Sequence, residues 1–167
     1  DIYTDLVGFG LDVTIYDPIA PSGAQQVMEW IRTHYESVSG RAGYADFYKV
    51  EINDKILQTV WNWLHDKNHE VEGLVYEFNG AIVGLAHYRG MPSPLRGQDI
   101  GFLDDLFVDP KHRGQKIGEK LINKMKEISK SKGWNLVRWI TRDDNVRAKS
   151  LYDRVAEKTN WDVYELK

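Results

Sequence analysis

A basic turn containing two glycines is the part of this sequence best suited to binding an anion. The segment is Arg113-Gly114-Gln115-Lys116-Ile117-Gly118, and it follows an apolar run that Asp109-Pro110 ends. Apolar residues then recur at helical spacing, so we expect a helix to begin near Arg113 or Gly114. First-turn amides have no intrahelical acceptors, and the two glycines leave room for a ligand near the backbone. The segment therefore predicts a phosphate-binding turn.

Many lysines of the same region have a simpler explanation. Residues 111–132 hold seven Lys and one Arg against two Glu, whereas the whole chain has a net charge of −3. For the lysines on the outward side of the helix we favour a solvated helix face. The uneven charge still indicates an anionic ligand at one place on the molecule.

Two adjacent carboxylates, Asp104 and Asp105, precede this turn and could supply a general base. Consecutive residues of a strand point to opposite faces, so we expect at most one of them to face a given cleft. Two like charges this close can raise one pKa, which suits a base in a partly dry site. The alternative is that one carboxylate bonds backbone amides or pairs with Arg138 or Arg142. The residues leave the choice between the two aspartates open.

Periodicity and turn signals predict the elements that must position these groups. Asn79-Gly80 favours a two-residue hairpin turn between two strand-like runs. The basic helix ends before Gly133, which suits a left-handed cap, and it bridges two strands, which predicts a parallel crossover. The expected strands are 12–16, 71–78, 81–89, 100–108, 135–141 and 161–166, with a loop at 91–97. Three other helices are expected. The first carries Val27, Ile31, His34 and Val38 on one stripe, the second begins near Asn53 or Asp54, and the third follows Asp143-Asp144-Asn145.

Composition limits the class of protein. The chain has 167 residues, 42% of them hydrophobic, which is the size of one domain with a substantial core. It has no cysteine, which excludes disulfides, cysteine-ligated zinc and a thiol-borne acyl-enzyme. His65 and His69 lack the glutamate of a His-Glu-x-x-His site, so we expect no metal.

The expected surroundings of the protein follow from the same composition. No apolar run reaches about 18 residues, and the net charge is negative, so we expect neither a membrane nor a nucleic-acid partner. We expect a cytoplasmic protein in which residues 11–167 form a single domain. Residues 1–10 are an N-terminal extension to which we assign no role.

Two motifs and the order of elements resemble the GNAT superfamily of acetyl-CoA-dependent N-acetyltransferases. The family's phosphate signature, Arg/Gln-x-x-Gly-x-Gly/Ala, stands here at 113–118, with Lys116 in place of the middle glycine. The second motif is the Asn-x-x-Ala-x-x-x-Tyr run at 145–152. Residues 100–108 and 141–145 look most similar to the histone/polyamine and diamine acetyltransferase branch. The resemblance implies an α/β (α+β) fold with a mixed, mostly antiparallel sheet, a parallel, splayed middle strand pair and about four flanking helices.

The same resemblance implies a reaction and its participants. Acetyl-CoA would give its acetyl group to a primary amine by direct transfer in a ternary complex. The amine would be a polyamine, a small amino compound or a lysine side chain. Asp104 or Asp105 would act as base and Tyr152 as acid, and a homodimer is implied. The alternative is a catalytically silent acyl-CoA-binding sensor or scaffold, which Lys116 favours.

The resemblance also assigns binding residues. The strand matching 106–108 would supply a main-chain amide to the thioester oxygen and pair with the pantetheine arm. The implied contacts to coenzyme A are Leu106, Phe107, Val108, Arg113, Gly114, Gln115, Lys116, Ile117, Gly118, Asn145, Ala148 and Tyr152. Aromatic groups suited to a cationic amine are the expected acceptor contacts, namely Tyr44, Phe47, Tyr48, His87 and Tyr88.

Overall fold

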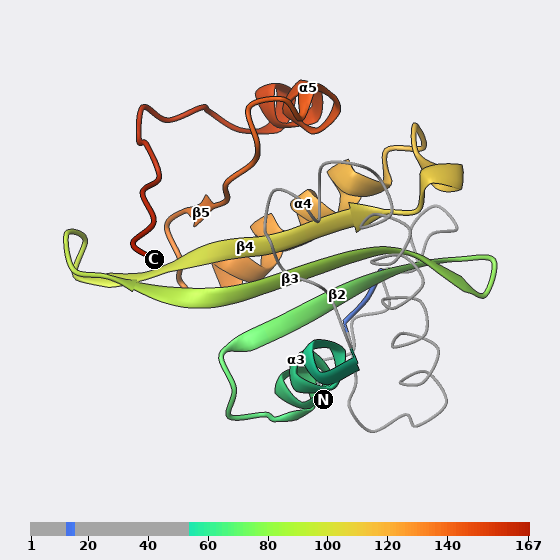
Figure 1. Ribbon diagram of the computed structural model, residues 1–167, viewed down its shortest axis with the longest axis horizontal. Helices are drawn as coiled ribbons and strands as arrows, with labels where there is room; N and C mark the ends of the chain where they lie inside the picture. The colour runs from blue at the N-terminus through green and yellow to red at the C-terminus, as the bar shows by residue number, and fades with distance from the viewer. Residues whose placement is uncertain (1–12, 16–53) are drawn as a thin grey trace.

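The computed structural model describes residues 13–15 and 54–167, whose strands form one five-stranded sheet in the order β1-β2-β3-β4-β5 (Figure 1). The strands are β1 (Val13–Ile15), β2 (Val71–Phe78), β3 (Ala81–Ser93), β4 (Gln98–Val108) and β5 (Val137–Arg138). The helices are α3 (Asp54–His65), α4 (Ile117–Ser131) and α5 (Val146–Val155), with a 3-10 turn η1 (Pro110–His112) before α4. β4 and β5 are parallel and the other pairs antiparallel, which confirms the predicted mixed sheet.

The hairpin between β2 and β3 forms where the sequence predicts it. Asn79 and Gly80 both have positive φ, 52° and 76°, as a tight two-residue hairpin turn requires. The next connection differs from the prediction, because the expected loop at 91–97 shrinks to a short turn. β3 continues to Ser93, which pairs with Gln98 at the start of β4. Beyond Arg89, β3 pairs with no described strand on its β2 side, and a strand edge tolerates Pro92.

β4 and β5 separate soon after they meet. Their pairing covers Gly101 with Val137 and Phe102 with Arg138, so the strand predicted at 135–141 is much shorter than expected. The predicted parallel, splayed pair is nevertheless confirmed. From Leu103 to Val108, no strand of the described structure lies along the β5 side of β4.

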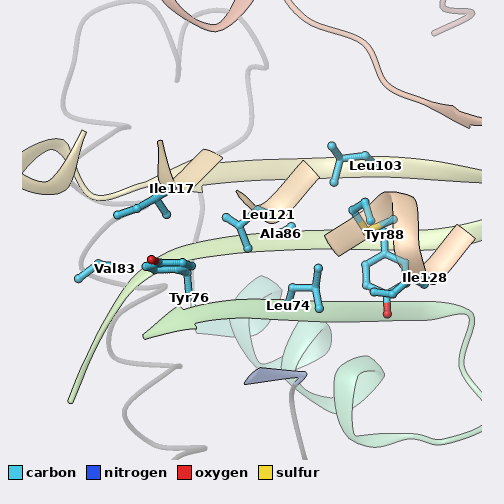
Figure 2. Close-up of a cluster of buried hydrophobic side chains, with 10 residues drawn as sticks. Leu74, Tyr76, Val83, Ala86, Tyr88, Leu103, Ile117, Leu121 and Ile128 are labelled. Carbon is cyan, nitrogen blue, oxygen red and sulfur yellow. The ribbon is translucent and has the colours of Figure 1, made fainter. Parts of the chain in front are cut away.

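The core lies between α4 and one face of the sheet, as Figure 2 shows. Its members are Leu74, Tyr76, Val83, Ala86, Tyr88, Leu103, Ile117, Leu121, Met125 and Ile128. α3 packs on the opposite face of β2, because a Cβ added to Gly73 would lie 3.1 Å from Leu64 Cδ2. The sheet therefore has a face covered by α4 and a second face, here called the α3 face, on the other side.

The two ends of the α4 region differ in how well they match the prediction. α4 begins at Ile117, later than the expected start near Arg113 or Gly114, because Pro110 starts a separate 3-10 turn and left-handed residues follow. Its end agrees with the prediction, since Gly133 has φ 73°.

The strand predicted at 161–166 does not form. Trp161 and Tyr164 are exposed, and among the described strands none pairs with this segment. The two-residue β5 offers no ladder long enough to hold another strand. The helix predicted around Val27 to Val38 lies outside the described residues.

Two further sequence features have a local structural explanation. His65 ends α3, where Nδ1 donates to Trp61 O at 2.7 Å, whereas His69 lies beyond the helix and accepts from Val71 N at 3.1 Å. Within residues 13–15 and 54–167, no group of three or more His, Asp or Glu side chains could hold a metal ion. None of the described helices is long and apolar enough to span a membrane.

Candidate active site

A β-bulge in β4 brings both aspartates to the α3 face of the sheet. The register pairs His87 with Asp105 and Tyr88 with Leu103, which leaves Asp104 as the extra residue. Asp105 contacts His87 and Asp104 contacts Arg89, and these partners stand two apart on β3, on one face. The expectation that the two carboxylates point to opposite faces is therefore wrong, because the bulge interrupts the alternation.

The Asp105 carboxylate is held on one side only. Its Oδ2 lies 3.0 Å from His87 Nδ1, and its side chain is 41% exposed. Its Oδ1 accepts no hydrogen bond from the described residues. His87, in contrast, is buried, at 3% exposure. The arrangement leaves Asp105 with one anchored oxygen and one available oxygen.

Asp104 is more fully engaged. Arg89 Nε donates to both of its oxygens, at 3.3 Å and 3.0 Å, and the Asp104 side chain is 30% exposed. Burial raises the pKa of Asp104, and the Arg89 guanidinium partly offsets that rise. An ion pair was expected for one aspartate, but its partner is Arg89, whereas Arg142 pairs with Asp144 at 2.8 Å. Arg89 was not predicted as a site residue, because the sequence marks it only by its position two residues after His87.

The turn before α4 has the backbone geometry of an anion cradle. Gly114 has φ 87°, and Lys116 adopts the left-handed conformation, φ 62° and ψ 18°. Lys116 is also the N-cap of α4, and its side chain makes no capping hydrogen bond. The first amides of a helix lack intrahelical acceptors and carry the positive end of its dipole. Gln115 and Lys116 are exposed, whereas the Ile117 side chain belongs to the core.

The two glycines of the turn serve different purposes. A Cβ on Gly114 would meet nothing within 4 Å, so glycine is required there for its positive φ. A Cβ on Gly118 would lie 3.1 Å from Leu151 Cδ2, so glycine at 118 allows α4 to approach α5. The close packing thus connects the turn to the helix that carries Tyr152.

Arg113 anchors the same turn to the end of β4. Its Nε donates to Val108 O at 3.0 Å, and its guanidinium lies 5.7 Å from the centre of the Phe107 ring. These contacts set the predicted phosphate turn beside the predicted pantetheine strand, whose residues 106–108 are half-buried. Arg113 therefore has a structural role in addition to any charge it offers a ligand.

α5 presents the tyrosine of the second motif. Asn145 caps the helix by accepting from Ala148 N at 3.4 Å, and its Nδ2 donates to Thr141 Oγ1 at 3.1 Å. Tyr152 is half-buried, and its ring meets that of Trp139 edge to face with centres 5.3 Å apart. Burial raises the pKa of Tyr152, which keeps the phenol protonated at neutral pH. Trp139 had no signal in the sequence.

The residues expected to contact the acceptor are not gathered in one place by the described structure. Tyr44, Phe47 and Tyr48 lie outside the described residues. Tyr88 faces α4 from within the core and donates to Glu72 Oε2 at 3.2 Å, on the face opposite the bulge carboxylates. His87 lies on the same face as Asp104 and Asp105 but is buried.

Comparison with known proteins identifies a family for this chain. The family model described as "Acetyltransferase (GNAT) family" matches residues 24–156. D-amino-acid N-acetyltransferase HPA3 of Saccharomyces cerevisiae is 27% identical over 124 residues, which cover 73% of this chain and 77% of that protein. Thialysine N-epsilon-acetyltransferase of Bos taurus is 39% identical over 71 residues, 42% of this chain, and the match spans only 41% of the bovine protein.

Solved structures agree on the fold. Ribosomal-protein-alanine N-acetyltransferase from Brucella melitensis has a TM-score of 0.72 at 18% identity, covering 95% of this chain and 99% of that one. AAC(6')-Iy, solved in complex with the bisubstrate analogue CoA-S-monomethyl-acetylneamine, has a TM-score of 0.70 at 14% identity, covering 94% and 97%. Since the family model covers most of the sequence, this chain belongs to the acetyltransferase (GNAT) family.

Proposed function

We propose that this protein is an N-acetyltransferase that transfers an acetyl group from acetyl-CoA to a primary amine. The acceptor class is a polyamine, a small amino compound or a lysine side chain. The observation that carries the proposal is the pair of bulge carboxylates on β4, the strand whose far end leads into the anion cradle. The relatives support it, because one is named for thialysine and another for D-amino acids, both of which carry amines.

The donor site would be built mainly from main-chain groups. The first turn of α4 and the left-handed residues before it suit a diphosphate, with Lys116 and Gln115 exposed beside them. The edge of β4 from Leu106 to Val108 faces no described strand, so an extended pantetheine arm can pair with it as an added strand. The family resemblance implies that Asn145 and Ala148 of α5 would contact the pantetheine arm. The residues present therefore fit acetyl-CoA.

Asp105 is the better of the two candidate bases. A primary alkylamine has a pKa of about 10.4, so it must lose a proton before its lone pair can react. Asp105 Oδ1 is available to take that proton, whereas both oxygens of Asp104 accept from Arg89. The Asp104–Arg89 pair then acts as a fixed neighbour that shapes the charge of the site.

Tyr152 completes the proton transfers. Bound acetyl-CoA supplies the thioester carbonyl that the amine attacks and the sulfur that leaves. A main-chain amide of residues 106–108 would donate to the carbonyl oxygen as its charge grows. The Tyr152 hydroxyl, which is protonated at neutral pH, would donate its proton to the leaving sulfur. Because the chain has no cysteine, no thiol-borne acyl-enzyme can form, which favours direct transfer to the amine.

Thiol release tests this proposal. The protein is mixed with acetyl-CoA and a panel of amines comprising a polyamine, a free amino acid and a lysine peptide, and coenzyme A binding is measured by calorimetry. Saturable release with one amine class, abolished by Asp105→Asn and reduced less by Asp104→Asn, is the expected result. Tight coenzyme A binding without release for any amine would support the silent acyl-CoA-binding module instead. No binding at millimolar coenzyme A would refute both.

A further inference from the structure

His87 is a buried polar side chain whose two ring nitrogens have very different surroundings. Nδ1 lies 3.0 Å from Asp105 Oδ2, whereas Nε2 is buried and has no hydrogen-bond partner among the described residues. On the β2 side, His87 faces Gly73, which has no side chain, and Leu64 of α3 packs there. The amine cannot reach Nε2 in this arrangement, so direct contact with the acceptor does not explain the imidazole.

The surroundings favour a ring proton on Nδ1 of His87. A proton on Nδ1 donates to the Asp105 carboxylate, and Nε2 then holds only a lone pair. Protonation of both nitrogens would bury an N–H group without an acceptor beside Leu64 and Gly73, which is costly. The geometry therefore favours a ring proton on Nδ1 that is directed at the Asp105 carboxylate.

We propose that His87 is a positioning residue for the base, an inference that rests on the proposed function. Its Nδ1–H group holds Asp105 Oδ2, which turns Oδ1 toward the acceptor amine and stabilises the ionised carboxylate. The burial of His87 makes it a rigid support, because neither solvent nor substrate competes for Nδ1.

The charges around the pair determine how the pH dependence should change. Asp104 and Arg89 are the described ionisable groups on the same face beside Asp105, while β2 and α3 contribute the uncharged Gly73 and Leu64. A hydrogen bond to the carboxylate favours its ionised form and lowers its pKa. Loss of the His87 donor must therefore move the acid limb of the kcat/KM profile to higher pH.

Two substitutions of His87 separate positioning from packing. His87→Leu keeps apolar volume but removes the donor, whereas His87→Asn can place its amide N–H group near the position of Nδ1. We expect His87→Leu to lower kcat about ten- to a hundred-fold and to move the acid limb to higher pH, with coenzyme A affinity retained. His87→Asn should restore most of the rate and the original limb. His69→Leu removes an imidazole that accepts from Val71 N and should leave the profile unchanged.

A direct measurement on the unaltered protein covers the possibility that the variants fail to fold. Nitrogen-15 NMR of the His87 ring at neutral pH should show a proton on Nδ1 that is hydrogen-bonded to the Asp105 carboxylate. A ring whose only proton is on Nε2 would overturn the proposal. So would a His87→Leu variant that folds with an unchanged pH profile.

The failure of this inference can be told apart from failure of the proposed function. If Asp105→Asn is inactive while folded His87→Leu is normal, the base assignment survives and the positioning role is refuted. If Asp105→Asn keeps full activity, the base assignment itself fails. In a protein that already carries Asp105→Asn, His87→Leu should cause no further loss of rate, because the imidazole acts through that carboxylate.

Discussion

The left-handed conformation of Lys116 predicts that Lys116→Gly stabilises the protein. Lys116 has φ 62° and ψ 18° at the start of α4, the position at which the family signature has glycine. Its side chain is exposed and makes no hydrogen bond or ion pair with the described residues, so its removal loses no structural contact. The main effect of the substitution is therefore on the backbone.

The magnitude follows from two opposing terms. A residue with a Cβ in the left-handed region costs about 1 to 2 kcal/mol, which glycine relieves. The greater freedom of glycine in the unfolded chain costs about 0.5 to 1 kcal/mol. The free energy of unfolding should rise by about 0.5 to 1 kcal/mol, which for a domain of this size corresponds to about 1 to 4 °C in Tm.

Thermal and urea unfolding of a small set of variants test this reasoning. Lys116→Ala removes the same charge but keeps a Cβ, so it should not gain stability. Gln115→Gly introduces glycine at the preceding position, where φ is not positive, and its free energy of unfolding should fall by about 0.5 to 1 kcal/mol. Equal stability of Lys116→Gly and Lys116→Ala would refute the argument from strain. Calorimetry with coenzyme A measures the effect of the Lys116 charge on cofactor affinity separately, since both Lys116 variants lose any phosphate contact equally.

Three further outcomes test the packing and the chemistry. Gly101→Ala would place a Cβ 2.7 Å from Trp134 Cε3. The free energy of unfolding measured in urea should therefore fall by about 1 to 3 kcal/mol, and Trp134→Leu should partly restore it. An unchanged free energy would contradict this packing. The added Cβ of Gly118→Ala should clash with Leu151 and reduce the transfer rate. Combining it with Leu151→Ala should restore the rate. An unchanged rate in Gly118→Ala alone would contradict the coupling between the turn and α5. Tyr152→Phe should lower kcat by about a hundred-fold with coenzyme A affinity retained. Because burial raises the pKa of Tyr152, the alkaline limb of the wild-type profile should lie above the usual tyrosine range and vanish in Tyr152→Phe; an unchanged profile would exclude the acid role.

Local signals in the sequence were sufficient for several elements and for the likeness to the family. Asn79-Gly80 predicted the hairpin because few residues adopt consecutive positive φ angles. The apolar spacing after Ile117 and the glycine at 133 predicted α4 and its end. Asn145 predicted the start of α5, where it caps the helix. Each of these features depends on residues a few positions apart, so periodicity and turn chemistry reveal it.

The arrangement of the candidate site depends on contacts between distant segments. The bulge at Asp104 exists because β3 and β4 change register between His87 and Tyr88, and strand alternation alone predicts opposite faces for Asp104 and Asp105. In the same way, Arg89 rather than Arg138 or Arg142 became the partner of Asp104.

The sequence by itself therefore determined the hairpin, the presence of α3, α4 and α5, and the end of α4, because short-range interactions stabilise these features. Only the tertiary structure decided the short β5, the absence of a strand at 161–166 and the shared face of the two carboxylates. The physical reason is that register and strand pairing are properties of two chain segments at once. Neither segment alone carries the information about which partner will satisfy its backbone groups.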